Sequence, residues 1–221
     1  MQRFFDVLFS GIALLILAPL FLILMVILKF SGEGEIFFFQ ERVGKNNKSI
    51  KLFKFATMLK NSEHIGTGTV TLHNDARILP VGGFLRKAKI NELPQLLNIL
   101  KGDMSVIGPR PQTRRCFDAF PKQLQPVIVE VRPGLSGIGS IVFRDEEKIM
   151  NDQRNADQYY DKVIMPYKAL LEEWYVKNNN LFLYFGLIAL TIWTVLIPKS
   201  RLIWRLLKSL PRPSAHLREL L

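Results

Sequence analysis

An almost uninterrupted apolar segment near the start of the chain constrains its fold more than any other feature. The segment reads VLFSGIALLILAPLFLILMVILKF from Val7 to Phe30. At about 1.5 Å per residue a helix of this length crosses a bilayer, and a helix that is apolar on every side favours lipid over a protein core. No small-residue cleavage site follows, which argues against a secretory signal peptide. The sequence therefore predicts a membrane helix within residues 1–30.

Pro19 lies near the middle of this segment, where a proline removes one backbone hydrogen bond and tends to kink a helix. Arg3 precedes the segment, and Lys29 and Arg42 follow it. Because positive residues mark the cytoplasmic side of a membrane segment, these flanks favour a re-entrant helix hairpin, broken at Pro19, that enters and leaves at the cytoplasmic face. A plain spanning helix is the alternative.

A second apolar segment, Leu181–Ile197, carries no charge and is close to the lower length limit for a membrane span. We expect it to lie in the membrane interface or to dip into it, with a short span as the alternative. Beyond it, Arg201, Arg205 and Lys208 share one face of a helical wheel, opposite a leucine-rich face. Residues 181–221 are therefore expected to end in a basic amphipathic helix on anionic lipid, although a helix packed on the domain is the alternative.

Residues 31–180 have the composition of a small cytoplasmic domain. Glu35–Phe39 and Ser49–Phe55 are predicted to form a β-hairpin, and Asn61–Asn74 a loop. Hydrophobic periodicity predicts further helices over Glu92–Leu100, Gln123–Glu130 and Asp157–Lys177. The expected fold class is α+β, mainly helical, in a monotopic membrane protein.

The charge balance points to a polyanionic partner. The chain has 30 Lys and Arg against 19 Asp and Glu, a formal charge of +11, with one cysteine and three histidines. This composition excludes an intrachain disulfide framework and argues against a zinc cluster. The excess positive charge suits nucleic acid, an anionic membrane or a phosphorylated substrate. Because basic and aromatic residues are not interleaved as in nucleic-acid modules, we do not expect a nucleic-acid partner.

A dense tract from Asn74 to Pro111 places cations beside carboxylates. The cations are Arg77, Arg86, Lys87, Lys89 and Arg110, and the carboxylates are Asp75, Glu92 and Asp103. Cations can hold phosphate oxygens while carboxylates hold Mg²⁺, so the tract predicts a site for a phosphorylated substrate and a divalent metal. A set of surface ion pairs is the alternative.

At these residues the chain resembles the bacterial sugar transferases, the monotopic polyprenyl-phosphate phosphoglycosyl transferases. Five phrases of that family follow in order, and the ordered series is specific where any one phrase would be weak: QERVG, KFATM, NDARILPVGGFLRK, NELPQLLNILKGDMSVIGPRP and RPGLSG. The resemblance covers nearly the whole chain. It implies a re-entrant membrane helix that carries a small cytoplasmic α/β domain.

The resemblance also implies a reaction. Such enzymes use Mg²⁺ to move a phosphosugar from a UDP-sugar to undecaprenyl or another polyprenyl phosphate, and they release UMP. They work on the cytoplasmic face of the bacterial inner membrane and start a lipid-linked glycan, such as an exopolysaccharide, an O-antigen, a capsule or a glycoprotein glycan. Downstream glycosyltransferases are then possible partners.

The chain departs from the family pattern at three positions. Asn91 stands where the family usually has the Asp that attacks the β-phosphorus, Ala56 where it usually has Arg, and Ala18 where it often has Ser. An amide is not a nucleophile of that kind. Three explanations of Asn91 are open. It is an introduced substitution, or the chain belongs to a natural sub-branch with a rearranged mechanism. Alternatively, the chain is a non-catalytic member that acts as a binding or scaffold protein. We favour the sub-branch, because the rest of the phosphate-binding tract is intact.

In such a sub-branch Glu92 is the best remaining carboxylate for a nucleophile, a metal ligand or a general base. Direct attack by the anionic polyprenyl phosphate oxygen is a further route. Asparagine is a common N-cap residue, so Asn91 could instead cap a helix that begins at Glu92.

By resemblance, Arg110 binds the nucleotide or its phosphates, Arg86 and Lys87 hold phosphate groups, and Arg77 belongs to the same diphosphate site. Asp145, in the acidic run FRDEE, could supply a metal ligand lost at Asn91. An acidic helix N-terminus favoured by the helix dipole is the alternative for that run.

Overall fold

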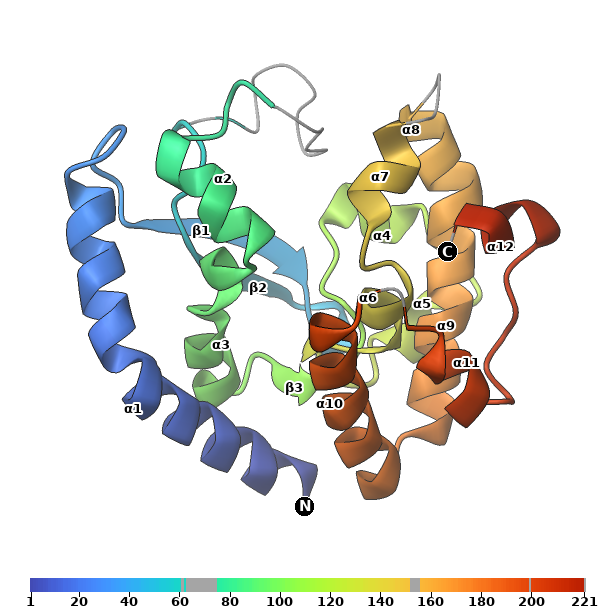
Figure 1. Ribbon diagram of the computed structural model, residues 1–221. Helices are drawn as coiled ribbons and strands as arrows, with labels where there is room; N and C mark the ends of the chain where they lie inside the picture. The colour runs from blue at the N-terminus through green and yellow to red at the C-terminus, as the bar shows by residue number, and fades with distance from the viewer. Residues whose placement is uncertain (61, 63–74, 152–155, 199, 221) are drawn as a thin grey trace.

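The computed structural model describes residues 1–60, 62, 75–151, 156–198 and 200–220. Apart from Ser62, the loop predicted over Asn61–Asn74 lies outside the described residues. Figure 1 shows a long N-terminal helix beside a mainly helical domain that contains two small sheets. The prediction of a mainly helical α+β fold is confirmed.

Helix α1 (Gln2–Lys29) is one continuous helix through Pro19. It is bent but not interrupted (Figure 1), so the chain is not divided into two helices at Pro19 as expected. Within the described residues it is the one helix long and apolar enough to cross a membrane. Many of its large apolar side chains face outward, among them Phe4, Leu15, Ile16, Leu22, Ile23 and Val26.

The N-terminal part of α1 is tied to the domain by the buried carboxylate of Asp6. Its Oδ1 accepts hydrogen bonds from Ser105 Oγ, the Val106 amide and Tyr184 Oη, each at 2.9 Å. Three donors satisfy a carboxylate that would otherwise be costly to bury. The apolar helix is therefore attached to the domain at a defined point.

Strands β1 (Phe37–Val43) and β2 (Ser49–Phe55) form the predicted antiparallel hairpin. The first strand begins two residues later than expected and continues to Val43. Asn46 and Asn47, both at positive φ, make the tight connection, a conformation that asparagine tolerates. Because side chains alternate along a strand, the hairpin turns one face, with both polar and apolar residues, toward a cavity. The hairpin residues on that face that line the cavity are Phe38, Gln40, Arg42, Leu52 and Lys54.

A run of short elements follows the hairpin: α2 (Pro80–Lys87), the 3₁₀ turn η3 (Ile90–Glu92) and α3 (Gln95–Lys101). The helix predicted from Glu92 therefore begins three residues later. Asn91 lies inside η3, and Pro94, which has no amide proton and suits the start of a helix, precedes α3. The capping role considered for Asn91 is wrong.

The rest of the domain is built around a parallel pair, β3 (Ser105–Ile107) and β4 (Gly134–Ser136). Short helices surround it: α4 (Arg114–Asp118), α5 (Gln125–Ile128), α6 (Ile138–Val142) and α7 (Glu146–Asn151). The long helical stretch predicted near Asp157 is confirmed. It consists of α8 (Ala156–Tyr159), a π-helical turn η4 (Tyr160–Ile164) and α9 (Met165–Asn178).

Helix α10 (Leu181–Leu196) has an apolar sequence, but only one of its faces is buried. Leu183, Tyr184 and Leu187 are buried in the domain core, whereas Phe182 and Leu196 are exposed. One face of α10 therefore packs in the domain core, and its opposite, apolar face is exposed. The location in the membrane interface stays a prediction.

The basic C-terminal segment differs from the predicted amphipathic helix. Helix α11 covers only Leu202–Leu206, and α12 covers Ala215–Leu220. Ile203 and Leu210 are buried in the domain core. At these two residues the segment therefore packs on the domain, as in the alternative that the sequence left open.

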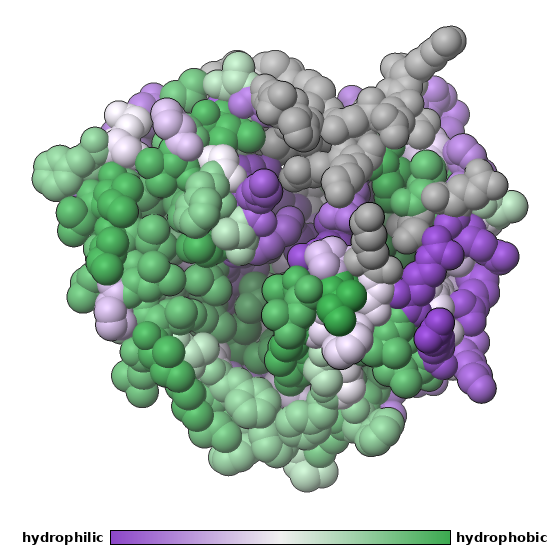
Figure 2. Space-filling view, in the orientation of Figure 1, coloured by the Kyte–Doolittle hydropathy of each residue, from purple (hydrophilic) through white to green (hydrophobic). Residues whose placement is uncertain are grey.

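The face of the molecule drawn in Figure 2 has separate hydrophobic and hydrophilic areas. In Figure 2 apolar side chains cover the left and lower sides, over α1 and α10, and hydrophilic side chains gather on the right, over the C-terminal segment.

Candidate active site

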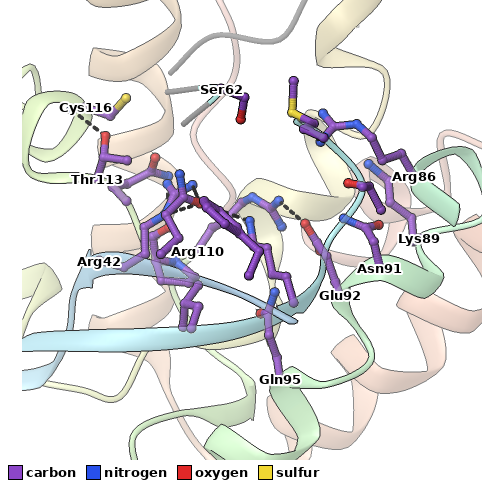
Figure 3. A pocket seen from close by; sticks show the side chains of 18 of the residues that line it. Arg42, Ser62, Arg86, Lys89, Asn91, Glu92, Gln95, Arg110, Thr113 and Cys116 are labelled. Carbon is purple, nitrogen blue, oxygen red and sulfur yellow. Dashed lines mark hydrogen bonds and ion pairs between the residues drawn. The ribbon is translucent and has the colours of Figure 1, made fainter. Parts of the chain in front are cut away.

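A polar cavity of about 270 Å³ opens between the hairpin, η3 and the loop that follows β3 (Figure 3). Among the described residues, six cationic side chains line it: Arg42, Lys54, Arg86, Lys89, Arg110 and Lys168. Two carboxylates, those of Glu92 and Glu146, share the lining. Such an excess of positive charge suits a polyanion of diphosphate size.

Glu92 and Arg110 form the ion pair at the centre of this cavity, with Arg110 Nη2 3.1 Å from Glu92 Oε1. The two side chains are 16% and 37% exposed, respectively. Burial by itself would raise the pKa of Glu92, but the charges of Arg110, Lys54 and Lys89 outweigh it and lower the pKa to about 2. The Glu92 charge in turn raises the pKa of Arg110. Both groups are therefore ionised at neutral pH.

The hairpin contributes a second group of cations around Gln40. Gln40 Oε1 accepts hydrogen bonds from Arg42 Nη2 at 2.5 Å and from Lys54 Nζ at 3.1 Å. Burial, and next the charge of Arg42, lower the pKa of Lys54 to about 7. Burial and the Arg110 charge likewise lower the pKa of Arg42. Two positive groups are thus held close together without a carboxylate between them, an arrangement that an anionic ligand would relieve.

Asn91 lies beside Glu92 in η3 and is 6% exposed. Its Oδ1 is buried and has no hydrogen-bond partner within the described residues. Figure 3 shows the side chains of Arg86, Lys89 and Asn91 side by side at the same edge of the cavity. The structure therefore brings together Arg86, Asn91, Glu92 and Arg110, four of the residues that the sequence indicated.

Three other predicted residues lie elsewhere. Lys87 is exposed and does not line the cavity. Arg77 is buried, pairs with Asp75 through Nη2 at 2.5 Å and donates to the Ser62 carbonyl, and it does not line the cavity. Asp145 is exposed and is likewise absent from the cavity lining.

The acidic residue of the FRDEE run that does reach the cavity is Glu146, next to Asp145. It pairs with Lys168, whose ammonium also lies 5.1 Å from the centre of the Phe143 ring and 5.3 Å from that of Tyr160. Helix α9 brings Lys168 here from a distant part of the sequence.

Glu172, one helical turn after Lys168, is a further residue that sequence reasoning missed. It is 2% exposed, and its Oε1 accepts a hydrogen bond from the Arg110 amide at 3.2 Å. Burial raises the pKa of this carboxyl to about 7. The packing is tight, because a Cβ on Gly139 would lie 2.3 Å from Glu172 Oε1. One sequence signal could have identified Lys168 and Glu172: they are two charged residues on an otherwise apolar side of α9.

The oxygen donors in the cavity fit a Mg²⁺ that takes most of its ligands from a substrate. Within the described part of the chain, no three acidic, histidine or cysteine side chains form a cluster able to hold a metal. Glu92 and the Asn91 Oδ1 atom, which lacks a partner, are adjacent in the cavity lining. Mg²⁺ commonly takes one or two protein oxygens and completes its shell with substrate phosphates and water.

The fold and the site thus define a class: a membrane-associated protein whose basic cavity suits a diphosphate. A sequence model of the family described as bacterial sugar transferase matches residues 1–198. The chain belongs to this family of transferase enzymes.

Individual relatives agree with this assignment. The chain is 38% identical to the exopolysaccharide production protein ExoY of Rhizobium meliloti over 159 residues, which cover 66% of this chain and 70% of that protein. It is 36% identical to the UDP-N-acetylgalactosamine-undecaprenyl-phosphate N-acetylgalactosaminephosphotransferase of Aeromonas hydrophila over 197 residues, 88% of this chain and 43% of that enzyme. It is 30% identical to the UDP-glucose:undecaprenyl-phosphate glucose-1-phosphate transferase of Klebsiella pneumoniae over 204 residues, 90% of this chain and 41% of that enzyme.

Proposed function

We propose that this protein transfers a phosphosugar from a UDP-sugar to undecaprenyl phosphate, releases UMP and so initiates a lipid-linked glycan. The observation that carries this proposal is the cavity in which, among the described residues, five further cations line the walls around the Glu92–Arg110 ion pair. The activities named for the Aeromonas and Klebsiella relatives support the same reaction.

The cavity accounts for the chemistry as charge stabilisation. In the direct route, an anionic oxygen of the polyprenyl phosphate attacks the β-phosphorus of the UDP-sugar. A bond from that oxygen to phosphorus forms, the bond from the β-phosphorus to the bridging oxygen breaks, and UMP leaves with the electron pair. Arg110, Arg86 and Lys54 would bind the diphosphate oxygens and stabilise the charge that develops on the leaving phosphate.

The pKa of Glu92 helps to decide among its three possible roles. A carboxylate whose pKa is about 2 is a weak base at neutral pH, so general-base catalysis fits it poorly. The attacking phosphate oxygen is already anionic and needs no base. We therefore assign Glu92 to the orientation of Arg110 and to metal binding.

A bound Mg²⁺ would be held by Glu92 and Asn91 Oδ1 and would neutralise part of the diphosphate charge. An amide oxygen can bind a metal although it cannot act as the nucleophile. The Asn91 Oδ1 atom without a partner supports this role.

The apolar surfaces indicate where the reaction takes place. The exposed sides of α1 and α10 are apolar over their whole length, with Leu15 at 78% and Leu196 at 72% exposure. We propose that both lie in the cytoplasmic face of the bacterial inner membrane, with α1 re-entrant, so that the cavity meets a lipid-bound acceptor. Anionic lipids would add to this attachment through the basic flanks.

The reaction is tested by UMP release from a panel of UDP-sugars, with undecaprenyl phosphate and Mg²⁺ present. We expect UMP and a polyprenyl diphosphate sugar with at least one donor, and no release without the acceptor. Binding of UDP-sugars without turnover of any of them would instead identify a non-catalytic binding protein, a function that Asn91 and Ala56 favour.

The Asn91→Asp variant distinguishes the two chemical routes. It places the usual family carboxylate at the edge of the cavity that Arg86 and Lys89 also line. We expect the variant, but not the wild-type protein, to give a phosphosugar adduct that mass spectrometry detects. An adduct on the wild-type protein would overturn the direct route.

A further inference from the structure

A second basic hollow lies in the C-terminal segment, largely beyond the residues that the family model matches. Its volume is about 450 Å³. We call it the arginine pocket, and its lining consists of Arg201, Trp204, Arg205, Arg212, Pro213 and Arg218. Four arginines from three consecutive segments (α11, the following turn and α12) thus meet at one place.

The segment that carries the arginine pocket is fixed on the domain. Ile203, Leu210 and Leu217 are buried in the domain core, at 4%, 2% and 1% exposure. Tyr167 Oη donates a hydrogen bond to the Pro211 carbonyl at 2.8 Å. These anchors hold the backbone in place, so the cluster of arginines is a property of the fold rather than of a free tail.

Contacts within the arginine pocket also orient its side chains. The Arg212 guanidinium lies 5.1 Å from the centre of the Trp204 ring, and its Nη2 donates to the Trp204 carbonyl at 3.1 Å. A cation over an aromatic face is stabilised by the ring. Trp204 therefore forms one wall and keeps Arg212 at the edge of the hollow.

Among the described residues, the arginine pocket lacks compensating negative charge. In that part of the chain no acidic residue lines it, and none of its four arginines forms an ion pair with a carboxylate. Arg201 immediately precedes α11, Arg205 lies within it, and both line the hollow, so their like charges repel each other. Binding of an anion would remove this repulsion.

We propose that the arginine pocket binds a phosphate group. Arginine presents paired N–H donors that match phosphate oxygens, and several converging guanidinium groups can share one phosphate. The phosphate can belong to the headgroup of an anionic phospholipid or to a soluble phosphorylated ligand, because the recognising chemistry is the same. The proposal does not depend on the transferase activity assigned to the central cavity.

The test uses the full chain and two probes. In the first arm, the protein in uncharged detergent is titrated with inorganic pyrophosphate while Trp204 fluorescence is followed. In the second arm, the protein is released from nanodiscs of mixed phosphatidylglycerol and phosphatidylcholine, and native mass spectrometry counts the phosphatidylglycerol molecules that it retains. In the Arg205→Ala/Arg218→Ala variant we expect the affinity or retention for at least one probe to fall by about tenfold, since two charge-assisted contacts are lost. Loss in the first arm identifies a soluble ligand, and loss in the second identifies a lipid headgroup.

The matched control removes two exposed lysines far along the sequence from the arginine pocket, neither of which lines it, in a Lys48→Ala/Lys122→Ala variant. It should bind both probes within about twofold of the wild-type protein, because screened surface charges contribute little. A Trp204→Phe variant shows whether the fluorescence signal comes from the arginine pocket. Unchanged binding of both probes in the arginine variant, or an equal loss in the lysine variant, would overturn the proposal.

Discussion

The central cavity and the arginine pocket are both rich in cations, but their charges are arranged differently. In the central cavity carboxylates sit among the cations, as in the pair of Glu92 with Arg110 at 3.1 Å. In the arginine pocket four arginines converge and no acidic residue lines the hollow. The first arrangement shifts pKa values and fixes side chains before a ligand arrives, whereas the second leaves its positive charge available. The first suits chemistry on a bound diphosphate, and the second suits binding alone.

The largest effect is expected at Glu92. The Glu92→Gln substitution keeps the shape of the side chain but removes the charge that orients Arg110, so kcat for UMP release should fall by about two to three orders of magnitude. Circular dichroism should show an unchanged fold, and Glu92→Asp should retain part of the activity. A wild-type rate in Glu92→Gln would refute the assigned role and weaken the contrast between the two sites.

Arg110 comes next. Lysine in its place keeps the charge but loses the planar pair of donors, so Arg110→Lys should raise the KM for the UDP-sugar by about tenfold. Initial rates over a range of donor concentrations measure the change. The matched substitution Arg205→Lys in the arginine pocket should leave KM unchanged, and an equal rise there would show that the two sites are not separate.

The pH dependence of substrate binding should reveal Lys54. Its pKa is lowered from 10.5 to about 7, so it is charged below about pH 7 and loses its proton as the pH rises through that value. The KM for the UDP-sugar should therefore increase above neutral pH. In Lys54→Arg, which stays charged, this increase should disappear. A pH profile of KM that is identical in the two proteins would exclude Lys54 as a phosphate ligand.

Glu172 is expected to affect stability in a pH-dependent way. Its pKa is raised from 4.5 to about 7, so the folded state favours the protonated form. The resulting stabilisation is complete below about pH 4.5 and is lost as the pH rises through about 7. The melting temperature of Glu172→Gln should therefore improve relative to wild type as the pH rises across this range. A pH-independent difference would mean that Glu172 does not titrate in the folded protein.

The smallest effect is expected from the arginine pocket. The Arg205→Ala/Arg218→Ala variant should release UMP in detergent within about twofold of the wild-type rate, because these side chains line a separate hollow. A loss comparable to that of Glu92→Gln would show that the arginine pocket takes part in the transfer.

Local sequence patterns predicted the elements that depend on neighbouring residues. The strand-like runs Glu35–Phe39 and Ser49–Phe55, with the turn-rich GKNNK between them, predicted the hairpin, and the apolar run predicted α1. The start of α3 was missed because Asn91 and Glu92 resemble a helix start, while Pro94 sets the actual one. Arg77 was placed in the diphosphate site because it is a cation in the basic tract, whereas its buried ion pair with Asp75 is a tertiary feature.

The sequence by itself determined the family, the long apolar N-terminal helix and the excess of positive charge. These are properties of residue type and order. Only the tertiary structure decided which of the many cations meet. Lys168 lines the central cavity, and Glu172 accepts a hydrogen bond from the Arg110 amide beside it, because α9 packs there. The C-terminal arginines converge because Ile203 and Leu210 are buried in the core. The sequence sets which residues are charged. Which of them lie together in a site depends on long-range packing, which no local sequence pattern predicts.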